Sequence, residues 1–341
     1  MKTSIKAALL AAACIIIFLL SVGLGSVSVG PGDVARVILH KLFGLSIEGV
    51  PPLHVTIIWT MRLPRVVMAF IVGIALGLSG TVMQSVLQNP LASSYTLGVS
   101  SGASLGAYLV MITGFSLPLI GSYTLPLFGF IFGFFTVIAT VALAGKIDGG
   151  MQNHTIVLAG MVFSLFVSAV LSFLSAFFKD TVERLVFWQL GTFSLKDWSY
   201  SALLLPIVAV CTLIALRHSR EMDIMTFGGE QAMAMGVELK KVKWILLITA
   251  AAMTGSAISL VGIIGFVDLI APHVARRFFG SRHSLVLPAS AAFSGAFMML
   301  CDLAARTIVS PSELPIGSIT ALIGAPFFAY IYFAKGGRKN A

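Results

Sequence analysis

The chain has 341 residues, of which 58% are hydrophobic and 10% are charged, with a net charge of +9 and a mean hydropathy of +1.00. A soluble domain carries about 25% charged residues, so this chain cannot cover an ordinary water-facing surface. The composition excludes a soluble enzyme, a disulfide scaffold and a nucleic-acid-binding module, and it predicts an all-α, polytopic membrane protein surrounded by lipid. Basic residues gather in the cytoplasmic loops of such proteins, which accounts for the net charge without nucleic acid as a partner.

Long intervals without Asp, Glu, Lys or Arg mark the predicted spans. The interval 66–145 alone is long enough for three crossings of about 20 residues each. We expect about ten transmembrane helices in a single domain that covers residues 1–341. The predicted spans are residues 7–29, 66–87, 97–113, 124–144, 155–177, 199–216, 243–261, 265–276, 285–303 and 318–334. Residues 31–61 and 179–197 are predicted as external loops.

The start of the chain imitates a secretory signal peptide, because Lys2 and Lys6 precede an apolar run. Many spans follow, so we expect this run to be retained as the first span with its lysines inside. Excess Lys and Arg marks the cytoplasmic side. The segments expected there are Lys146, residues 217–243, Arg276, Arg277 and Arg282, and the tail with Lys335, Arg338 and Lys339. Both termini are therefore predicted to be cytoplasmic.

The eighth span is predicted to be short. The basic positions Lys243 and Arg276 are both expected inside, so the chain crosses twice between them with too few residues for two full spans. The turn near 262–265 is then recessed in the membrane. Irregular backbone at that depth must be buried in protein or line a cavity, so this turn points to a transport route.

Three arginines are expected on the external side, against the general orientation of basic residues. Arg62 and Arg65 flank a proline at the start of the second span, and Arg306 follows the ninth. One interpretation is that they anchor helix ends at the membrane interface. The other is that they meet an acidic docking partner or an anionic ligand.

Glycines recur at four-residue spacing in several spans. In lipid this spacing lets helix backbones approach closely, which favours tight helix packing over a route lined by small residues. The positions are Gly73, Gly77, Gly98, Gly102, Gly106, Gly129 and Gly133.

The cytoplasmic segment 217–243 contains a compact predicted helix from Glu230 to Gly236, with a glycine at its C-terminal end. Ala232 lies in its middle, between methionines that supply an adaptable apolar face. It is either an ordinary surface helix or a docking helix for a cytoplasmic protein.

Asp268 lies inside a predicted span, where an ionisable residue is costly and is a functional candidate by default. It serves transport or proton movement, or it pairs with a neighbour, or it lies near the recessed turn, where water reaches it. His273 lacks metal-ligand spacing to any other histidine. Cys14, Cys211 and Cys301 lie in separate apolar runs, so no disulfide or metal framework is expected. No Ser-His-Asp arrangement is visible in the sequence, and no P-loop motif occurs, so any ATP and magnesium are expected on a partner protein.

Several segments in register resemble the permeases of ABC importers for iron chelates and cobalamin. The resemblance covers about residues 55–335. The matching segments are Arg62-Leu63-Pro64-Arg65, Gln88-Asn89-Pro90-Leu91-Ala92, residues 97–103, Leu158-Ala159-Gly160, Trp188-Gln189-Leu190-Gly191, residues 230–236, Ile264-Gly265-Phe266, Pro272-His273-Val274-Ala275-Arg276, Glu313-Leu314-Pro315-Ile316-Gly317 and Gly324-Ala325-Pro326-Phe327.

The resemblance implies a homodimer of ten-span subunits in the inner membrane, with two cytoplasmic P-loop ATPases and an extracytoplasmic substrate-binding protein. It implies that Arg62, Arg65 and Arg306 dock the binding protein. It assigns ATPase coupling to Glu230, Ala232 and Gly236. It assigns the cytoplasmic gate to Asn89, Pro90, Leu91, Asn153 and His154. The chain itself is then neither an enzyme nor a cofactor-binding protein.

Two positions depart from the family pattern. Gly229 stands where relatives usually carry a second glutamate, and Asp268 stands where they usually carry a small residue. The leading hypothesis is import of a ferric siderophore, with haem or cobalamin as alternatives in the same family. A secondary transporter that moves protons through Asp268 is the rival from another class. A membrane-embedded enzyme would need a paired acid, base or metal cluster in the spans, which the sequence does not present.

Overall fold

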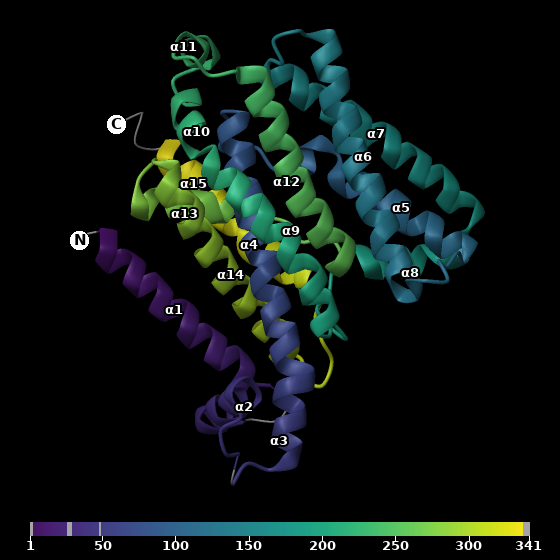
Figure 1. The fold of residues 1–341 in the computed structure, drawn as a ribbon. Coiled ribbons are helices and arrows are strands. Elements are labelled where there is room, and N and C mark those ends of the chain that lie inside the picture. Colours follow the sequence, from purple (N-terminus) through teal and green to yellow (C-terminus); the bar gives the residue numbers. More distant parts are fainter. Residues whose placement is uncertain (1–2, 26–28, 48, 337–341) are drawn as a thin grey trace.

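The computed structural model describes residues 3–25, 29–47 and 49–336, which form helices and connecting segments without any strand. The N-terminal helix leads to a small helical region at one end of the bundle, and α10 and α11 lie at the opposite end (Figure 1). Lys2, Arg338 and Lys339 lie outside the described residues. The all-α prediction is confirmed for the part of the chain that the structure describes.

Within the described residues, seven helices are long and apolar enough to cross a membrane. Their spans are Thr3–Gly23 (α1), Pro52–Val86 (α3, η1 and α4), Gly121–Ile147 (η3 and α6), Asn153–Phe177 (α7), Trp198–Arg217 (α9), Leu239–Val261 (α12) and His283–Thr307 (α14). Two shorter apolar helices are α5, Val99–Thr113, and the part of α15 at Ile316–Tyr330. Each predicted span overlaps one helix, but α5 and α13 are shorter than a full crossing and only the part of α15 at Ile316–Tyr330 is assessed, so the number ten stays a prediction.

The remaining elements are short helices and turns. They are α2, Pro31–Phe43; α3, Pro52–Thr56; η1, Ile57–Arg62; η2, Ser94–Leu97; η4, Lys179–Thr181; α8, Val182–Gln189; α10, Ser219–Met225; α11, Gly229–Ala234; and α13, Val267–Phe279. Helix α4 itself begins at Leu63 and α6 at Thr124, whereas α15 runs from Ile316 to Gly336.

Two predicted span boundaries are wrong, the start of the second span and the end of the first, whereas 179–197 holds no helix of span length among the described residues. The expected loop over 31–61 contains α2 and a continuous helical run from Pro52, through the wide turns of η1, into α4. The second span therefore begins well before residue 66, at Pro52, which occupies a first helical turn, where a missing N–H costs nothing. The other expected loop, 179–197, contains α8. Helix α1 ends at Gly23, earlier than predicted.

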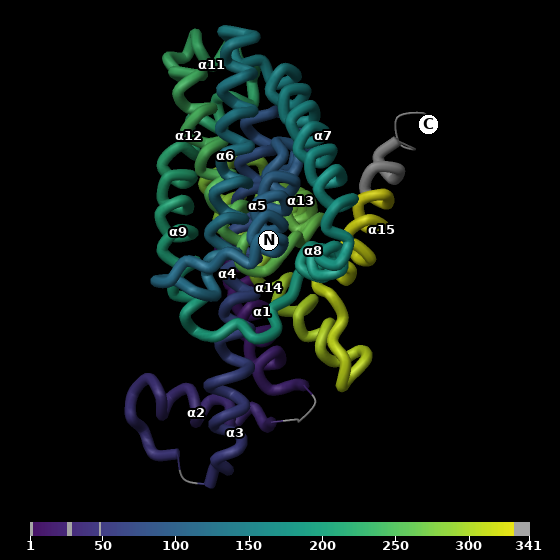
Figure 2. The backbone as a smooth tube through the Cα atoms, turned by 90° about the vertical axis from the view of Figure 1, so that its right-hand side faces the viewer, coloured from purple at the N-terminus to yellow at the C-terminus, as the bar shows by residue number. Residues whose placement is uncertain are grey.

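Helices α4 and α12 form the centre of the bundle. The share of buried residues differs between the spans over the most apolar 18-residue window of each. It is 83% in Pro52–Val86 and 78% in Leu239–Val261, but 22% in α7 and 11% in α1. Figures 1 and 2 show α4 running between the surrounding helices. A helix that is apolar all round and buried in this way belongs to the interior of a membrane bundle.

Glycines set the close approach of these helices. A Cβ atom on Gly77 or Gly73 of α4 would overlap the backbone or side chain of Ser294 in α14, and one on Gly106 of α5 would overlap the carbonyl of Phe128 in α6. A Cβ atom on Gly133 would also overlap a neighbour, the carbonyl oxygen of Val99, whereas one on Gly129 would make only ordinary contacts. The packing interpretation of the glycine spacing is therefore confirmed at most of these positions.

The expected break before the eighth span is present. Residues 262–266 are not helical and lead into α13, a helix of 13 residues. Thr192 donates its N–H to the carbonyl of Val261 at 2.8 Å, and the Tyr95 hydroxyl donates to the carbonyl of Ile264. Ile264 is 1% exposed. This irregular backbone is thus buried at Gly262 and Ile264 and partly exposed at Ile263, Gly265 and Phe266, so it is only partly enclosed by the described residues of one chain.

Candidate functional site

The three arginines predicted to lie outside converge where α1 and α14 end and α4 begins, but their side chains are not freely exposed. Arg62, Arg65 and Arg306 are 7%, 9% and 9% exposed. They line one cavity of about 320 Å³ together with Glu313 and Met61. The sequence correctly grouped the residues, whereas their burial follows from the helices packed around them.

Asp302 connects two of these arginines. Its Oδ1 accepts a hydrogen bond from Nε of Arg65 at 2.8 Å, and its Oδ2 lies 3.3 Å from Nε of Arg306. Nη1 of Arg65 also donates to Oε1 of Glu313 at 2.6 Å. Asp302 is fully buried, whereas Glu313 is exposed. Buried charges of this kind are tolerated when they are paired and hydrogen-bonded.

The guanidinium groups of Arg62 and Arg306 donate hydrogen bonds to backbone carbonyls at the C-terminal end of α1. Nη1 of Arg62 donates to the carbonyls of Val22 and Gly23 at 3.1 and 2.8 Å. Arg306 donates to the carbonyls of Leu24, at 3.0 Å, and Ser21. The last carbonyls of a helix lack partners within the helix and carry partial negative charge, so guanidinium groups stabilise them. An incoming anion would therefore meet cations that already hold α1 in place.

The predicted gate residues lie in two segments that touch. Asn89, Pro90 and Leu91 are exposed after the end of α4, and the Asn89 side chain accepts the N–H of Leu91 at 2.9 Å. Gln88, which has a positive φ of 51°, accepts a hydrogen bond from the side chain of Asn153 at 3.3 Å. The structure thus joins the 88–91 turn to the start of α7.

Lys243 fixes the α7 side of this contact. Its ammonium donates to Oδ1 of Asn153 and to the carbonyl of Met151, both at 2.7 Å. Asp148 orders the turn before them, because it accepts the N–H groups of Gln152 and Gly150. These hydrogen bonds, the one from Gln152 first, lower the pKa of the Asp148 carboxyl. His154 is exposed beside the cluster.

The predicted coupling helix is present as α11. Ala232 is fully buried, Glu230 is exposed, and Gly236 adopts a φ of +87° just beyond the helix. Phe227, 70% exposed, and Met235, 63% exposed, give this end of the molecule an apolar surface. Exposed apolar groups on a segment outside the predicted spans are typical of a protein-binding surface.

Helix α10 connects this surface to the gate. The side-chain amide of Gln88 donates to the carbonyl of Met225, the last residue of α10. Gln88 therefore touches both α10 and Asn153. The sequence offered only a weak signal for this residue, its place at the head of the Asn89-Pro90 turn.

A second contact joins α10 to the membrane helices. Oδ1 of Asp223 accepts the backbone N–H of His283 at 2.8 Å and lies 2.6 Å from its Nδ1, and the opposite ring nitrogen of His283 meets the hydroxyl of Ser85. This Ser-His-Asp arrangement was not visible in the sequence. Ser85 is 5% exposed in the last turn of α4, and its hydroxyl donates to the carbonyl of Thr81 at 2.8 Å. It therefore links helices α4, α10 and α14 and does not present an accessible nucleophile.

Asp268 is buried within the chain, with 1% exposure. The Ser93 hydroxyl donates to one of its carboxyl oxygens, and the other oxygen has no hydrogen-bond partner among the described residues. Its backbone lies against Gly80, where a Cβ atom would overlap its carbonyl. Asp268 thus ties the start of α13 to the 92–97 connection and to α4.

Comparison with known proteins identifies the family to which the chain belongs. The FecCD transport family matches residues 13–334. The chain is 40% identical over 323 residues to the uncharacterized ABC transporter permease protein YvrB of Bacillus subtilis, covering 94% of this chain and 92% of YvrB. It is 38% identical over 283 residues to the cobalamin import system permease protein BtuC of Halobacterium salinarum, covering 83% and 75%. The chain belongs to the FecCD transport family.

A solved structure supports the same family assignment. A metal-chelate type ABC transporter in an inward-facing conformation superposes with a TM-score of 0.82 at 29% identity, covering 95% of this chain and 97% of the other. This FecCD family member is therefore a multi-pass inner-membrane protein with a transport role. Family membership was predicted from the motifs, whereas Gln88, Asp223, Lys243 and Asp302 were not singled out.

Proposed function

We propose that this chain is the permease subunit of an ATP-driven importer of a metal chelate, with a ferric siderophore as cargo. The observation that carries the proposal is the match to the FecCD transport family over residues 13–334, together with the superposition on a metal-chelate type ABC transporter. Two copies of the chain form the translocation route between them. Two cytoplasmic ATPases bind and hydrolyse ATP with magnesium, so the permease binds no cofactor.

In this proposal the external binding protein docks on the arginine cavity of α4 and α14. Acidic side chains of the binding protein approach Arg62, Arg65 and Arg306, and they compete with Glu313 for Arg65. The pairing of Arg65 with Glu313 at 2.6 Å supports this competition, because it shows that a carboxylate fits at the edge of the cavity.

The inner side converts ATPase movement into gating. The ATPase contacts Glu230, Ala232 and Gly236 and displaces α11 together with α10. Movement of α10 acts on Gln88, and through Gln88 on the gate residues Asn89 to Leu91 and Asn153 to His154. The hydrogen bonds from Gln88 to Met225 and from Asn153 to Gln88 support this route. A ligand or partner shifts such an equilibrium only through different affinity for the two states.

Cobalamin is the second candidate cargo, favoured by the 38% identity to the cobalamin permease of Halobacterium salinarum. Haem remains within the same class of chelates. Selectivity would reside mainly in the external binding protein, because the permease spans are largely free of charge.

Reconstitution tests the proposal. The chain is placed in vesicles with its ATPase and its binding protein, and uptake of a radiolabelled ferric siderophore is compared with uptake of cobalamin and haem. We expect siderophore uptake only with ATP and with both partners present. Uphill uptake by the chain alone would contradict the importer proposal. Uptake of cobalamin without uptake of the siderophore would show that cobalamin, and not a ferric siderophore, is the cargo.

The variant Asp268→Asn separates this proposal from a proton-coupled transporter. We expect ATP-dependent uptake to persist in this variant and to be insensitive to collapse of the proton gradient, because Asp268 acts as a contact between α13 and the 92–97 connection. Uptake that follows the proton gradient and vanishes in Asp268→Asn would instead establish coupling through this carboxyl group.

A further inference from the structure

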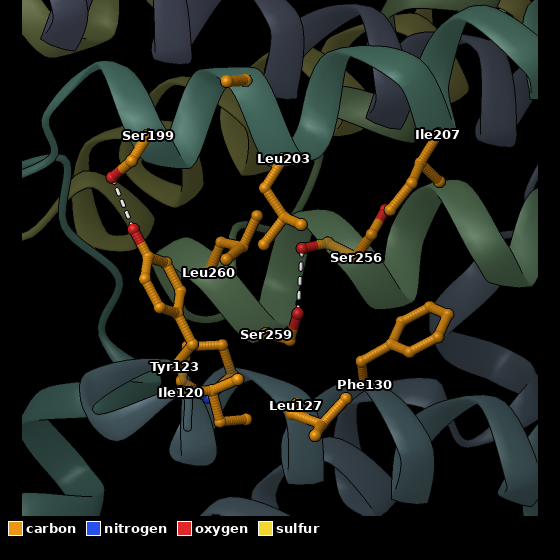
Figure 3. Close-up of a pocket in the computed structure, with 12 residues that line it drawn as sticks. Ile120, Tyr123, Leu127, Phe130, Ser199, Leu203, Ile207, Ser256, Ser259 and Leu260 are labelled. Carbon is orange, nitrogen blue, oxygen red and sulfur yellow. Dashed lines mark hydrogen bonds between the residues drawn. The ribbon is translucent and has the colours of Figure 1, made fainter. Parts of the chain in front are cut away.

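A cavity between α6, α9 and α12 is separate from the arginine cavity and from the gate. It has a volume of about 690 Å³. Figure 3 shows side chains of α9, among them Leu203 and Ile207, on one side, and Leu127 and Phe130 of α6 on the other. Its size lies within the range of about 300–1,000 Å³ that is usual for small-molecule sites.

The walls of this cavity are apolar in effect. No lining residue is charged. Ser256 and Ser259 of α12 form its floor, and their hydroxyls donate to carbonyls of their own helix, those of Ala252 at 2.6 Å and of Ser256 at 3.0 Å. Because both hydroxyl protons are used within α12, the floor offers only acceptor oxygens, and the lining side chains other than Tyr123, Ser199, Ser256 and Ser259 are apolar. An occupant that fits this lining therefore presents an apolar body.

The cavity opens toward the surroundings of the bundle. Leu203 is 47% exposed and Leu127 is 37% exposed, whereas Ser256 and Ser259 are buried behind them. Both rims belong to helices long and apolar enough to cross the membrane. In a bilayer, the phase that meets such an opening consists of lipid chains.

The mouth of the cavity carries the features of a membrane interface. The hydroxyl of Tyr123 is hydrogen-bonded to Ser199 across it (Figure 3). The rings of Tyr123 and Tyr200 lie 5.2 Å apart, and Trp198 packs at the same distance on Trp59. Clustered Trp and Tyr mark the level of lipid headgroups, so an acyl chain in the cavity would have its headgroup here.

Lys196 supplies a cation at this level. Its ammonium lies 4.4 Å from the centre of the Tyr200 ring. The neighbouring carboxylate of Asp197 accepts the N–H of Ser199 at 3.0 Å and also its hydroxyl, so Asp197 is engaged in capping α9. Burial lowers the pKa of Lys196, although Asp197 opposes this, which indicates that an additional anion would stabilise the ammonium.

We propose that this cavity is a phospholipid site, in which one acyl chain lies between α6 and α9 against Ser256 and Ser259, and the lipid phosphate contacts Lys196. The inference goes beyond the transport function and does not depend on the cargo. The lipid fills the space that the three helices leave open, and thereby holds α9, which continues into α10, at a fixed distance from α6.

Native mass spectrometry of the full chain, purified in mild detergent with and without added phosphatidylglycerol, tests the proposal. We expect one phospholipid retained per chain. Ser259→Phe fills the floor of the cavity and should abolish lipid retention. Leu203→Trp narrows the rim and should reduce lipid retention, and it keeps the test valid if the buried Ser259→Phe change impairs folding. Leu213→Phe, at a site on the same helix that is 67% exposed and outside the cavity, should leave retention unchanged.

Lys196→Gln isolates the headgroup contact. One lysine at a membrane surface contributes about 1 kcal/mol toward an anionic lipid, so we expect retention of phosphatidylglycerol to fall about fivefold. Absence of bound lipid in the native chain, or equal retention by Ser259→Phe and Leu213→Phe in folded protein, would overturn the proposal. The proposal would also be overturned if Ser259→Phe lost self-association but retained as much lipid as the native chain, because the face that carries the cavity would then be a contact between copies of the chain.

Discussion

At the scale of single residues, Asp302 decides how the outer arginines are held. It lies fully buried between Arg65 and Arg306, at 2.8 Å and 3.3 Å from their Nε atoms. Such an arrangement is weak evidence for net stabilisation, because burying each charge carries a desolvation cost of several kcal/mol. Its removal is nevertheless damaging, since two guanidinium groups then remain buried without their shared carboxylate.

We therefore expect Asp302→Asn to lower the free energy of unfolding by about 3–5 kcal/mol, the usual cost of breaking a buried pair. Thermal unfolding of the purified protein in detergent measures the change. Glu313→Gln is the matched control, because Glu313 contacts the same Arg65 from an exposed position and should cost under about 1 kcal/mol. Equal unfolding temperatures for the two variants would show that Asp302 does not bind the cluster together.

At the scale of helices, glycine positions set the distances in the bundle. Helix α4 lies against α13 at Gly80 and against α14 at Gly73 and Gly77. Van der Waals packing between close backbones replaces the hydrophobic driving force that is absent in lipid. A methyl group at a closed glycine therefore separates two helices.

Gly80→Ala should destabilise the protein by about 1–3 kcal/mol, as overpacking usually does, because its Cβ would overlap the backbone of Asp268. Gly129→Ala should be neutral or slightly stabilising, because the nearest atom to a new Cβ there is the Cβ of Ser259 at 3.5 Å. Thermal unfolding of both variants tests this difference. A Gly80→Ala protein as stable as Gly129→Ala would contradict the close approach of α4 and α13.

Helix α10 has a role that its length of seven residues does not suggest. It contacts Gln88, beside the predicted gate residues, through the carbonyl of Met225, and it contacts His283 at the start of α14 through Asp223. His283 in turn meets Ser85 near the end of α4. The segment that carries α10 and α11 is thus attached to the membrane helices at two places, as the proposed transmission of movement from α11 would need.

At the scale of the whole molecule, the arginine cavity and the coupling surface lie at opposite ends of the bundle. The C-terminal end of α1 marks one end and α11 the other (Figure 1). A partner at each end can act on the same central helix, because α4 begins beside the arginines and ends at the gate turn.

For docking at the outer end, we expect Glu313→Gln to strengthen binding of an acidic external binding protein by about fivefold, since one surface ion pair is worth up to about 1 kcal/mol and its loss frees Arg65. Binding is measured on reconstituted vesicles at several salt concentrations. Glu183→Gln on α8, another exposed acid, is the control and should leave affinity unchanged. Unchanged or weaker binding in Glu313→Gln would argue against docking through this cavity.

The sequence by itself determined the membrane class, the approximate place of the helices, the short helix after residue 266 and the family. These are local properties, because hydropathy, charge-free intervals and motif order are written along the chain. It failed over 31–61, where helices with polar faces lack the apolar signal of a span.

Only the tertiary structure decided which distant residues meet. Arg65 and Asp302, 237 positions apart, the Ser85, His283 and Asp223 contact, and the cavity walled by α6, α9 and α12 all depend on how helices pack. Helix packing is fixed by the shapes of many side chains acting together, and no local pattern encodes it.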